Sequence, residues 1–344
     1  MPSVTARSER MIKERQIEIL SMAEGFIQSC ILFALLKLKI FHRIDKGRKN
    51  LNELAADLDV QPETLSRVLN AGVVLNLLES NDGVNFSIDP VYQASLSPSG
   101  GEYYIGDLIS SFDFFQTALL KLDEAVLNSK PTIDPLSHVG GEKETTSGFI
   151  LGFHNYASLR GKELAHFLST ADCKSLLDLG CGPGTYAFHL GMRNPSLELY
   201  LLDRPEVLEI AKEVQTKYKL ENKVYYLPLD AIKDDVPGSY DIILISNMLV
   251  GLGENESRQL LKRLYGSVNK GGSLVIQAQY LRDDRLGERW PVFLDLMVLC
   301  TTPKGRNHSR RETRIWLEEA GFTNIEFCSM SIFNTNSFLR GFKF

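Results

Sequence analysis

The chain has 344 residues, of which 44% are hydrophobic and 24% are charged, and its net charge at pH 7 is −5. This length favours two domains, because a single hydrophobic core stops growing at about 250–300 residues. The composition is that of an ordinary soluble globular protein, and the negative charge argues against nucleic acid or an anionic membrane as the main partner.

The N-terminal segment, MPSVTARSERMIKERQ, is polar and lacks the apolar core of a secretory signal. Residues 10–41 show helical periodicity, and their most apolar stretch, 26–36, is too short to span a bilayer, so we expect a buried or interface helix. Five scattered cysteines without a CxxC pair indicate reduced thiols and no zinc site. These features predict a cytoplasmic protein with no metal centre and no membrane partner.

A helix–turn–helix pattern followed by a hairpin comes next. Apolar residues in 51–58 predict a short helix, Pro62 is placed to begin a second helix, and Asn81-Asp82-Gly83 predicts a hairpin turn. This order of elements is typical of a winged helix. The turn-rich segment 90–101 then predicts a domain boundary, so we expect a domain over residues 1–101.

A winged helix raises the alternative of a DNA-binding regulator. A helix that reads DNA needs Arg, Lys, Asn or Gln toward bases and phosphates. Between Glu63 and Glu79 the only cation is Arg67, accompanied by Asn70 and Asn76. The sequence therefore favours packing or homodimer formation through this domain, with no nucleic-acid partner.

Residues 102–344 are predicted to form the second domain. Residues 102–170 have a mainly helical pattern, interrupted by a loop over 129–148. After Lys174, short β-rich runs alternate with helical stretches, and this alternation predicts a doubly wound parallel sheet, hence an α/β fold. The β-rich runs are SLLDLG, ELYLLD, KVYYLPLD, DIILIS and SLVIQAQY.

A glycine-rich turn follows the first of these runs, in SLLDLGCGPGTYAFHL (175–190). Glycines at such a strand-to-helix turn permit a sharp bend and let a ligand approach the backbone. The spacing of Gly180, Gly182 and Gly184 differs from that of dinucleotide sites, and Pro183 removes one phosphate-binding amide. The turn alone is weak evidence for any ligand.

Acidic residues end the next two predicted strands. Asp203 could hold the two hydroxyls of a ribose, and Asp230 could accept from an adenine amine. The alternative is that both carboxylates only cap helices. Because an acid ends each of three consecutive strands, counting Asp178 before the glycine turn, a nucleoside site is favoured.

This combination resembles the class I S-adenosylmethionine (SAM) dependent methyltransferases. More narrowly, the chain resembles the small-molecule O-methyltransferases of the caffeate, hydroxyindole and polyketide-tailoring type, from about residue 15 to the end. The matching blocks are LDLGCGPGTYA, LLDRPEV, SNMLVGLGENES, VNKGGSLVIQ and DLMVLCTTPKGRNHSRRETRIWLEEAGF. The resemblance implies a winged-helix dimerisation domain before a Rossmann-like domain, SAM as cofactor and a small-molecule acceptor.

The resemblance also implies a role for individual residues. The three glycines of the turn would lie along the methionine and ribose of SAM, and Asp178 would orient the turn or contact the amino group through water. Asp203 would bind the ribose, Asp230 and Ala231 would flank the adenine, and Ser246 and Asn247 would line the sulfonium side.

The chain departs from this family where the family has its general base. A His follows the fourth strand in the family and takes the acceptor's proton, but the corresponding residue here is Val250. Acidic residues that support the His correspond to Asn307, next to His308, and to Gln277. Loss of a positioned base removes a factor of about 10² to 10⁴ for an unactivated hydroxyl.

Three interpretations remain open. The acceptor needs no base, as with a carboxylate, a neutral amine or an activated enol carbon; another residue acts as base; or SAM is bound but its methyl is not transferred. Replacement bases would be His154, predicted on a helix before the sheet, or His308. Either imidazole could instead be an ordinary structural histidine.

An aromatic segment, EYYIGDLISSFDFFQ (102–116), lies where the resemblance implies the acceptor pocket. Tyr104, Phe114 and Phe115 are the candidate walls, with Met297 facing the same cavity. The alternative is that these side chains belong to the core. As pocket walls they predict an apolar or aromatic acceptor, such as a polyketide-like secondary metabolite.

Overall fold

The computed structural model describes residues 4–133, 143–330 and 337–344. The chain divides into two compact units, Met1–Ser110 and Ser111–Phe344. The helix α6 (Gly106–Leu119) crosses from the first unit to the second. The domain boundary after residue 101 stays a prediction.

The first unit is mainly helical with a small sheet of order β1-β3-β2. Pro62 occupies the first turn of its helix as expected, and β2 and β3 pair antiparallel, with Leu78 opposite Ile88, so the predicted helix–turn–helix and hairpin are confirmed. The elements are α1 (Val4–Lys37), α2 (Ile40–Arg43), β1 (Lys49–Asn50), α3 (Leu51–Leu58), α4 (Pro62–Val74), β2 (Leu78–Glu79), β3 (Asn85–Ile88), α5 (Gln93–Leu96) and the 3₁₀ helix η1 (Pro98–Tyr103).

Helix α1 is a single helix of 34 residues, much longer than the apolar stretch within it. Only its C-terminal end is buried, through residues such as Leu35, whereas Ile19, Leu20 and Met22 are 65%, 60% and 78% exposed within this chain. By length and composition alone, an 18-residue window of Ser8–Lys37 with a mean hydropathy of 1.8 is apolar enough to cross a membrane. The helix predicted from the periodicity of residues 10–41 is present, but its apolar stretch is longer than the segment 26–36 taken from the sequence.

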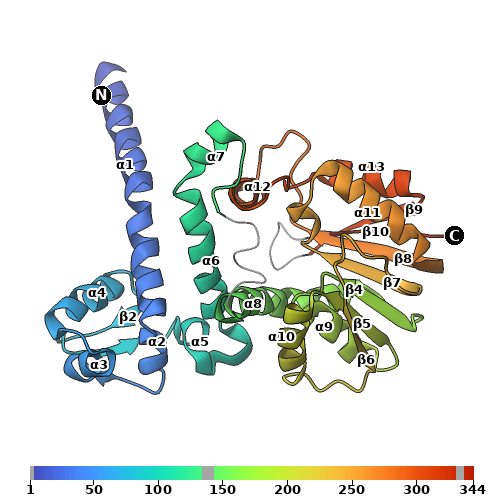
Figure 1. The fold of residues 1–344 in the computed structure, drawn as a ribbon. Helices are drawn as coiled ribbons and strands as arrows, with labels where there is room; N and C mark the ends of the chain where they lie inside the picture. Colours follow the sequence, from blue (N-terminus) through green and yellow to red (C-terminus); the bar gives the residue numbers. More distant parts are fainter. Residues whose placement is uncertain (1–3, 134–142, 331–336) are drawn as a thin grey trace. The chain divides into compact units, whose positions relative to one another are not determined.

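The second unit is built around a sheet of order β6-β5-β4-β7-β8-β10-β9 (Figure 1). From β4 to β8 all neighbouring strands are parallel, as the alternation of strands and helices predicts. The strands are β4 (Ser175–Leu179), β5 (Glu198–Asp203), β6 (Val224–Pro228), β7 (Tyr240–Ser246), β8 (Val268–Ala278), β9 (Thr323–Ser329) and β10 (Ser337–Phe342).

Helices cover both faces of this sheet (Figure 1). Because neighbouring residues of a strand face opposite sides, Leu176 packs with the α8–α9–α10 side and Leu177 with the α11–α13 side. The helices of the second unit are α7 (Leu122–Asn128), α8 (Lys143–Phe167), α9 (Thr185–Arg193), α10 (Pro205–Gln215), η2 (Leu249–Gly251), α11 (Glu254–Gly266), α12 (Arg289–Thr301) and α13 (Arg310–Ala320).

Two features differ from the sequence prediction. The strands β10 and β9 were not predicted, and both pairings of β10 are antiparallel, so the sheet is mixed rather than wholly parallel. The few residues between Ser329 and Ser337 are too short for the crossover that a parallel pair requires. The predicted loop 129–148 is also shorter than expected, because α8 begins at Lys143.

Candidate functional site

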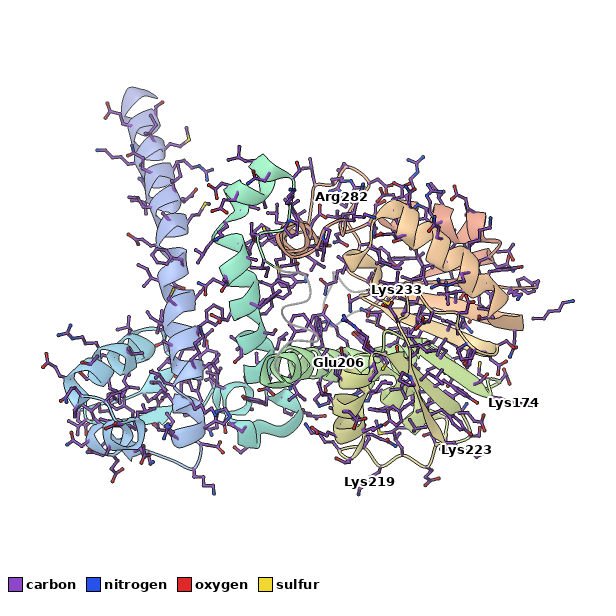
Figure 2. All side chains as sticks on the ribbon, viewed as in Figure 1. Lys174, Glu206, Lys219, Lys223, Lys233 and Arg282 are labelled. Atoms are coloured by element: carbon purple, nitrogen blue, oxygen red, sulfur yellow. The ribbon has the colours of Figure 1, made fainter. Side chains whose placement is uncertain are left out.

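A large cavity of about 580 Å³ lies where β4, β5, β6 and β7 end. Figure 2 marks the two edges of the sheet: Lys174 and Lys223 lie where β4 and β6 begin, and Glu206 and Lys233 lie just after β5 and β6 end. Ligands of open α/β sheets bind at the carboxyl ends of the strands. Of the residues proposed from the sequence, those that line the cavity are Gly180, Gly182, Asp203, Asp230, Ala231, Ser246 and Asn247.

The glycine turn forms one wall of the large cavity. Gly180, Gly182 and Gly184 have φ values of 67°, 53° and 73°, in the left-handed region that glycine adopts without strain. A Cβ on Gly180 would lie 2.7 Å from the sulfur of Met248, and one on Gly184 would lie 2.4 Å from Leu201. Glycine therefore lets the backbone of the turn lie close to Met248, just after β7, and to Leu201 in β5.

Asp203, the last residue of β5, is fixed by two backbone amides. The amide of Gly182 donates to Oδ2 at 2.8 Å, and the amide of Arg204 donates to Oδ1 at 2.8 Å. A carboxylate has about four acceptor positions, so both oxygens can still accept from a ligand. Burial raises the pKa of Asp203, and the two amides oppose that effect. The side chain is therefore preoriented to accept from paired hydroxyls.

Asp230 follows β6 and closes a turn. Its Oδ1 accepts from the amides of Ile232 and Lys233 at 2.9 and 3.2 Å, and Oδ2 forms an ion pair with Lys233 Nζ at 3.2 Å. Partial burial alone would raise the pKa of Asp230, but these amides and the ammonium together lower it. The capping role considered from the sequence is thus present, at a position that also lines the cavity.

Asp178 lies in β4 and is only 1% exposed. Neither of its carboxylate oxygens makes a hydrogen bond of normal geometry in the described part of the chain, although the backbone amide of Ala187 lies close enough to lower its pKa. Burial, with the nearby charge of Asp203, raises the pKa of Asp178 to about 8. Asp178 does not line the cavity, so its position suits support of the turn better than direct ligand contact.

The end of β7 supplies the wall opposite the glycine turn. The buried Oγ of Ser246 has no hydrogen-bond partner in the described residues, which leaves it available to a ligand in the cavity. Asn247 has a left-handed φ of 52°, and its Nδ2 donates to Gln277 Oε1 at 3.0 Å. Strand β7 therefore ends in two uncharged polar groups at the cavity.

Helix α8 contributes an apolar wall that the sequence reasoning missed. Ile150, Phe153, Tyr156 and Ala157 all line the large cavity. Their spacing, close to one and two helical turns, was the signal that could have identified this face. Burial raises the pKa of Tyr156 to about 12, partly opposed by Arg160, whose guanidinium carbon lies 3.3 Å from the ring centroid.

The predicted aromatic residues lie in different places. Phe114 and Phe115 pack on Phe149 with ring centroids 5.8 and 6.2 Å apart, and Phe149 packs on Phe153 at 4.8 Å. They therefore continue the aromatic wall of α8 without lining the cavity themselves. Tyr104 belongs to the first unit, where its ring contacts His42. Its role as a wall of the acceptor pocket therefore stays a prediction. Met297 is 5% exposed, within α12.

The residues that replace the family's base lie together around a much smaller cavity of about 10 Å³, next to the large one. Asn247 lines both cavities, and the small one is also lined by Val250, Gln277, Asn307 and His308. The positions that the resemblance assigns to the base and its supporting residues therefore lie together in the structure, although their roles stay predictions.

Asn307 is occupied by structural hydrogen bonds. Its Nδ2 donates to the carbonyl oxygens of Gln279 and Pro291 at 2.8 and 3.0 Å, and its Oδ1 accepts from the amide of His308 at 3.0 Å. Its own amide donates to Asp295 Oδ1 at 2.6 Å. The carboxamide thus joins the end of β8 to α12 and has little capacity left to orient a base.

The two candidate bases, His308 and His154, do not line the large cavity. His308 is 4% exposed, its Nε2 lies 3.1 Å from the carbonyl oxygen of Leu249, and burial lowers its pKa. His154 Nδ1 contacts Thr185 Oγ1 at 2.9 Å, and burial, together with the charges of Lys217 and His189, lowers its pKa to about 4. The structure therefore argues against His154 as the base, because this residue does not line the large cavity and its Nδ1 contacts Thr185. Helical spacing predicted the face of the helix on which His154 lies but not this partner.

The large cavity thus combines the acidic groups of Asp203 and Asp230 with an uncharged, partly aromatic region. Among its described lining residues, the ionisable ones are Tyr156, Cys181, Tyr186, Asp203, Arg204, Asp230 and Lys233, and none is a histidine. Burial raises the pKa of the Cys181 thiol well above its ordinary value. Within the described ranges, no group of three or more His, Cys, Asp or Glu side chains could hold a metal ion.

Comparison with known families identifies two matching regions. Residues 129–323 match the O-methyltransferase domain, and residues 20–96 match the O-methyltransferase dimerisation domain. The 3-hydroxy-5-methyl-1-naphthoate 3-O-methyltransferase of Streptomyces sahachiroi is 24% identical, over 94% of each chain. The N,N-dimethyltransferase OxyT of Streptomyces rimosus is 24% identical, over 88% of this chain and 90% of its own.

Solved structures share this fold. PigF with S-adenosylhomocysteine (SAH) superposes with a TM-score of 0.86 at 20% identity, covering 95% of this chain and 99% of PigF. Human N-acetylserotonin methyltransferase in complex with SAM gives a TM-score of 0.83 at 20% identity, covering 100% of this chain and 99% of the human chain.

Proposed function

We propose that this chain, which belongs to the O-methyltransferase family, is a SAM-dependent methyltransferase that acts on a small aromatic or polyketide-like metabolite. The observation that carries the proposal is the large cavity at the strand ends, where Asp203 is held by two backbone amides beside the glycine turn. A carboxylate preoriented in this way matches the paired hydroxyls of a ribose.

The residues of the cavity fit SAM from end to end. Asp203 would accept from the ribose hydroxyls, and Asp230 and Ala231 would flank the adenine. The glycine turn would hold the methionine part, and Ser246 and Asn247 would line the sulfonium side. The otherwise unpartnered hydroxyl of Ser246 supports this placement, because a buried polar group without a partner is costly.

SAM supplies an electrophilic methyl group on a sulfonium. The residues of the chain then have to bind the acceptor, exclude water and accommodate its proton. Val250 cannot accept a proton, and Asn307 and Gln277 are amides that cannot act as carboxylate partners of a base. Burial raises the pKa of the Tyr156 phenol and of the Cys181 thiol, which both line the cavity, so neither is ionised at neutral pH and ready to accept a proton.

We therefore favour an acceptor that attacks the methyl group without first losing a proton to a base at position 250, namely a neutral amine, a carboxylate or an activated enol carbon. Family membership alone would suggest a hydroxyl acceptor, and a relative that acts on 3-hydroxy-5-methyl-1-naphthoate is consistent with this. A relative that is an N,N-dimethyltransferase shows that the same chain architecture also serves nitrogen. The apolar wall of Ile150 and Phe153, backed by Phe149, suits a flat aromatic acceptor.

We also propose that the enzyme is a homodimer formed through the first unit. The dimerisation model covers residues 20–96, and α1 carries large apolar side chains such as Ile19 and Met22 that are exposed within one chain. Burial of this surface against a second copy is the simplest reason for an apolar helix of this length.

The proposed function is tested by ligand binding followed by turnover. We expect mass spectrometry of the purified protein to detect bound SAM or SAH, and calorimetry to give a dissociation constant in the micromolar range. In a screen of aromatic amines, carboxylates and phenols, the enzyme should then release SAH with at least one acceptor that is not a phenol. Failure of SAM to bind would contradict the proposal, and binding without SAH release would favour a reaction of the same fold that does not transfer the methyl.

A further inference from the structure

Asn247 is held to a single neighbour by both its backbone and its side chain. Its amide donates to the carbonyl oxygen of Gln277 at 2.9 Å, and its Nδ2 donates to Gln277 Oε1 at 3.0 Å. Gln277 is fully buried in β8, on the next strand of the sheet. The left-handed φ of 52° turns Asn247 out of β7 at this point, a conformation that asparagine tolerates better than most residues.

This arrangement fixes the orientation of the Asn247 carboxamide. Asn247 lines both cavities, whereas Gln277 lines only the small one. The nitrogen and oxygen of a planar carboxamide diverge from the same carbon, so a nitrogen directed to Gln277 leaves Oδ1 directed away from it. Oδ1 of Asn247 is therefore directed away from Gln277, in a residue that also lines the large cavity at the end of β7.

We propose that Gln277 is a positioning residue that holds Asn247 Oδ1 toward the sulfonium methyl group, so that the site favours SAM over its product SAH. The inference rests on the proposed function, which places the sulfonium beside Ser246 and Asn247. A sulfonium and its polarised methyl C–H bonds attract a carbonyl oxygen, and the neutral thioether of SAH does not. Weaker retention of SAH would aid product release.

The charges of the cavity lie elsewhere. Asp203 and Asp230 are at the ends of β5 and β6, where the ribose and adenine are placed, and β7 ends in Ser246 and Asn247, which carry no charge. Any preference for a cation at the end of β7 must therefore come from oriented dipoles. A dipole acts in this way only when its orientation is held, which is the role assigned to Gln277.

The test measures the affinities of ligand-free protein for SAM and SAH by calorimetry. Gln277→Met keeps the size of the side chain but removes the accepting oxygen, and it should weaken SAM binding about fivefold while SAH binding changes less than twofold. Gln277→Glu retains an accepting oxygen and should restore the SAM affinity. Asn247→Gly suits the left-handed φ and removes the carboxamide, so it should reproduce the loss specific to SAM.

Gln279→Met is the matched control. Gln279 is also buried near the end of β8, but its Oε1 has no hydrogen-bond partner in the described residues, whereas Gln277 Oε1 accepts from Asn247, so substitution of Gln279 should leave both affinities within twofold of wild type. Equal losses of SAM and SAH affinity in Gln277→Met, or no change in Gln277→Met and Asn247→Gly, would overturn the inference. Absence of SAM binding by the wild type would instead refute the proposed function.

Discussion

Replacement of Asp203 by alanine is expected to weaken SAM binding by about 1–3 kcal/mol, or roughly 5- to 150-fold. The ribose hydroxyls would lose a charged acceptor that the amides of Gly182 and Arg204 hold in place at 2.8 Å. The same substitution leaves both amides without their partner, so the melting temperature of the ligand-free protein should also fall. Because the amides are orphaned in both the free and the bound protein, the change in affinity reports mainly on the ribose contact.

Calorimetry with SAM provides the assay, and Glu206→Ala provides the control. Glu206 is an exposed acid at the same edge of the sheet, where Figure 2 labels it, and it does not line the large cavity. Its removal changes the net charge equally but should leave SAM affinity within about twofold. The assignment of Asp203 is wrong if Asp203→Ala binds SAM as tightly as wild type, or if both variants lose the same affinity.

Three further predictions concern stability and assembly. The pKa of Asp178 is raised to about 8, above its ordinary value near 4 in an unfolded chain, so the ligand-free protein should lose stability as pH rises between these values. Urea unfolding of Asp178→Asn should lack this decline, and an unchanged slope would show that Asp178 is not its source. Gly184→Ala should lower the melting temperature more than Gly182→Ala, because its Cβ would lie 2.4 Å from a side chain while that at Gly182 meets nothing within 4 Å; equal melting temperatures would contradict the close packing of the turn. Met22→Asp should convert a homodimer to a monomer in light scattering, and a dimer that persists would place the interface away from this part of α1.

Local rules explain the parts of the structure that the sequence predicted well. Pro62 and Asn81-Asp82-Gly83 mark the start of a helix and a hairpin turn, and the structure has both. Strand β4 and the glycine turn were predicted because a buried run followed by closely spaced glycines has few alternative conformations. Asp203 was found for the same reason, since a strand end fixes where its last residue lies.

The missed features depend on contacts between distant segments. Strand β9 lies at the sheet edge and is largely exposed on both faces, so it carries no clear alternation of apolar and polar residues. Helical periodicity placed His154 on a face of its helix but could not reveal Thr185 as its partner. The sequence predicted the acceptor wall in the aromatic run 102–116, whereas the aromatic side chain of Phe153 in α8 lines the large cavity. Tyr104 from that run belongs to the first unit.

The central claim is that methyl transfer here does not use a base at position 250, and the most direct test compares wild type with Val250→His. SAH release would be measured from pH 6 to 9 with the acceptor found in the screen. We expect no tenfold gain in rate and no new limb near pKa 6.5, because Asn307 is occupied by structural hydrogen bonds and cannot orient an imidazole. A rise of an order of magnitude or more would contradict the account and identify the site as an ordinary O-methyl transfer site that has lost its base.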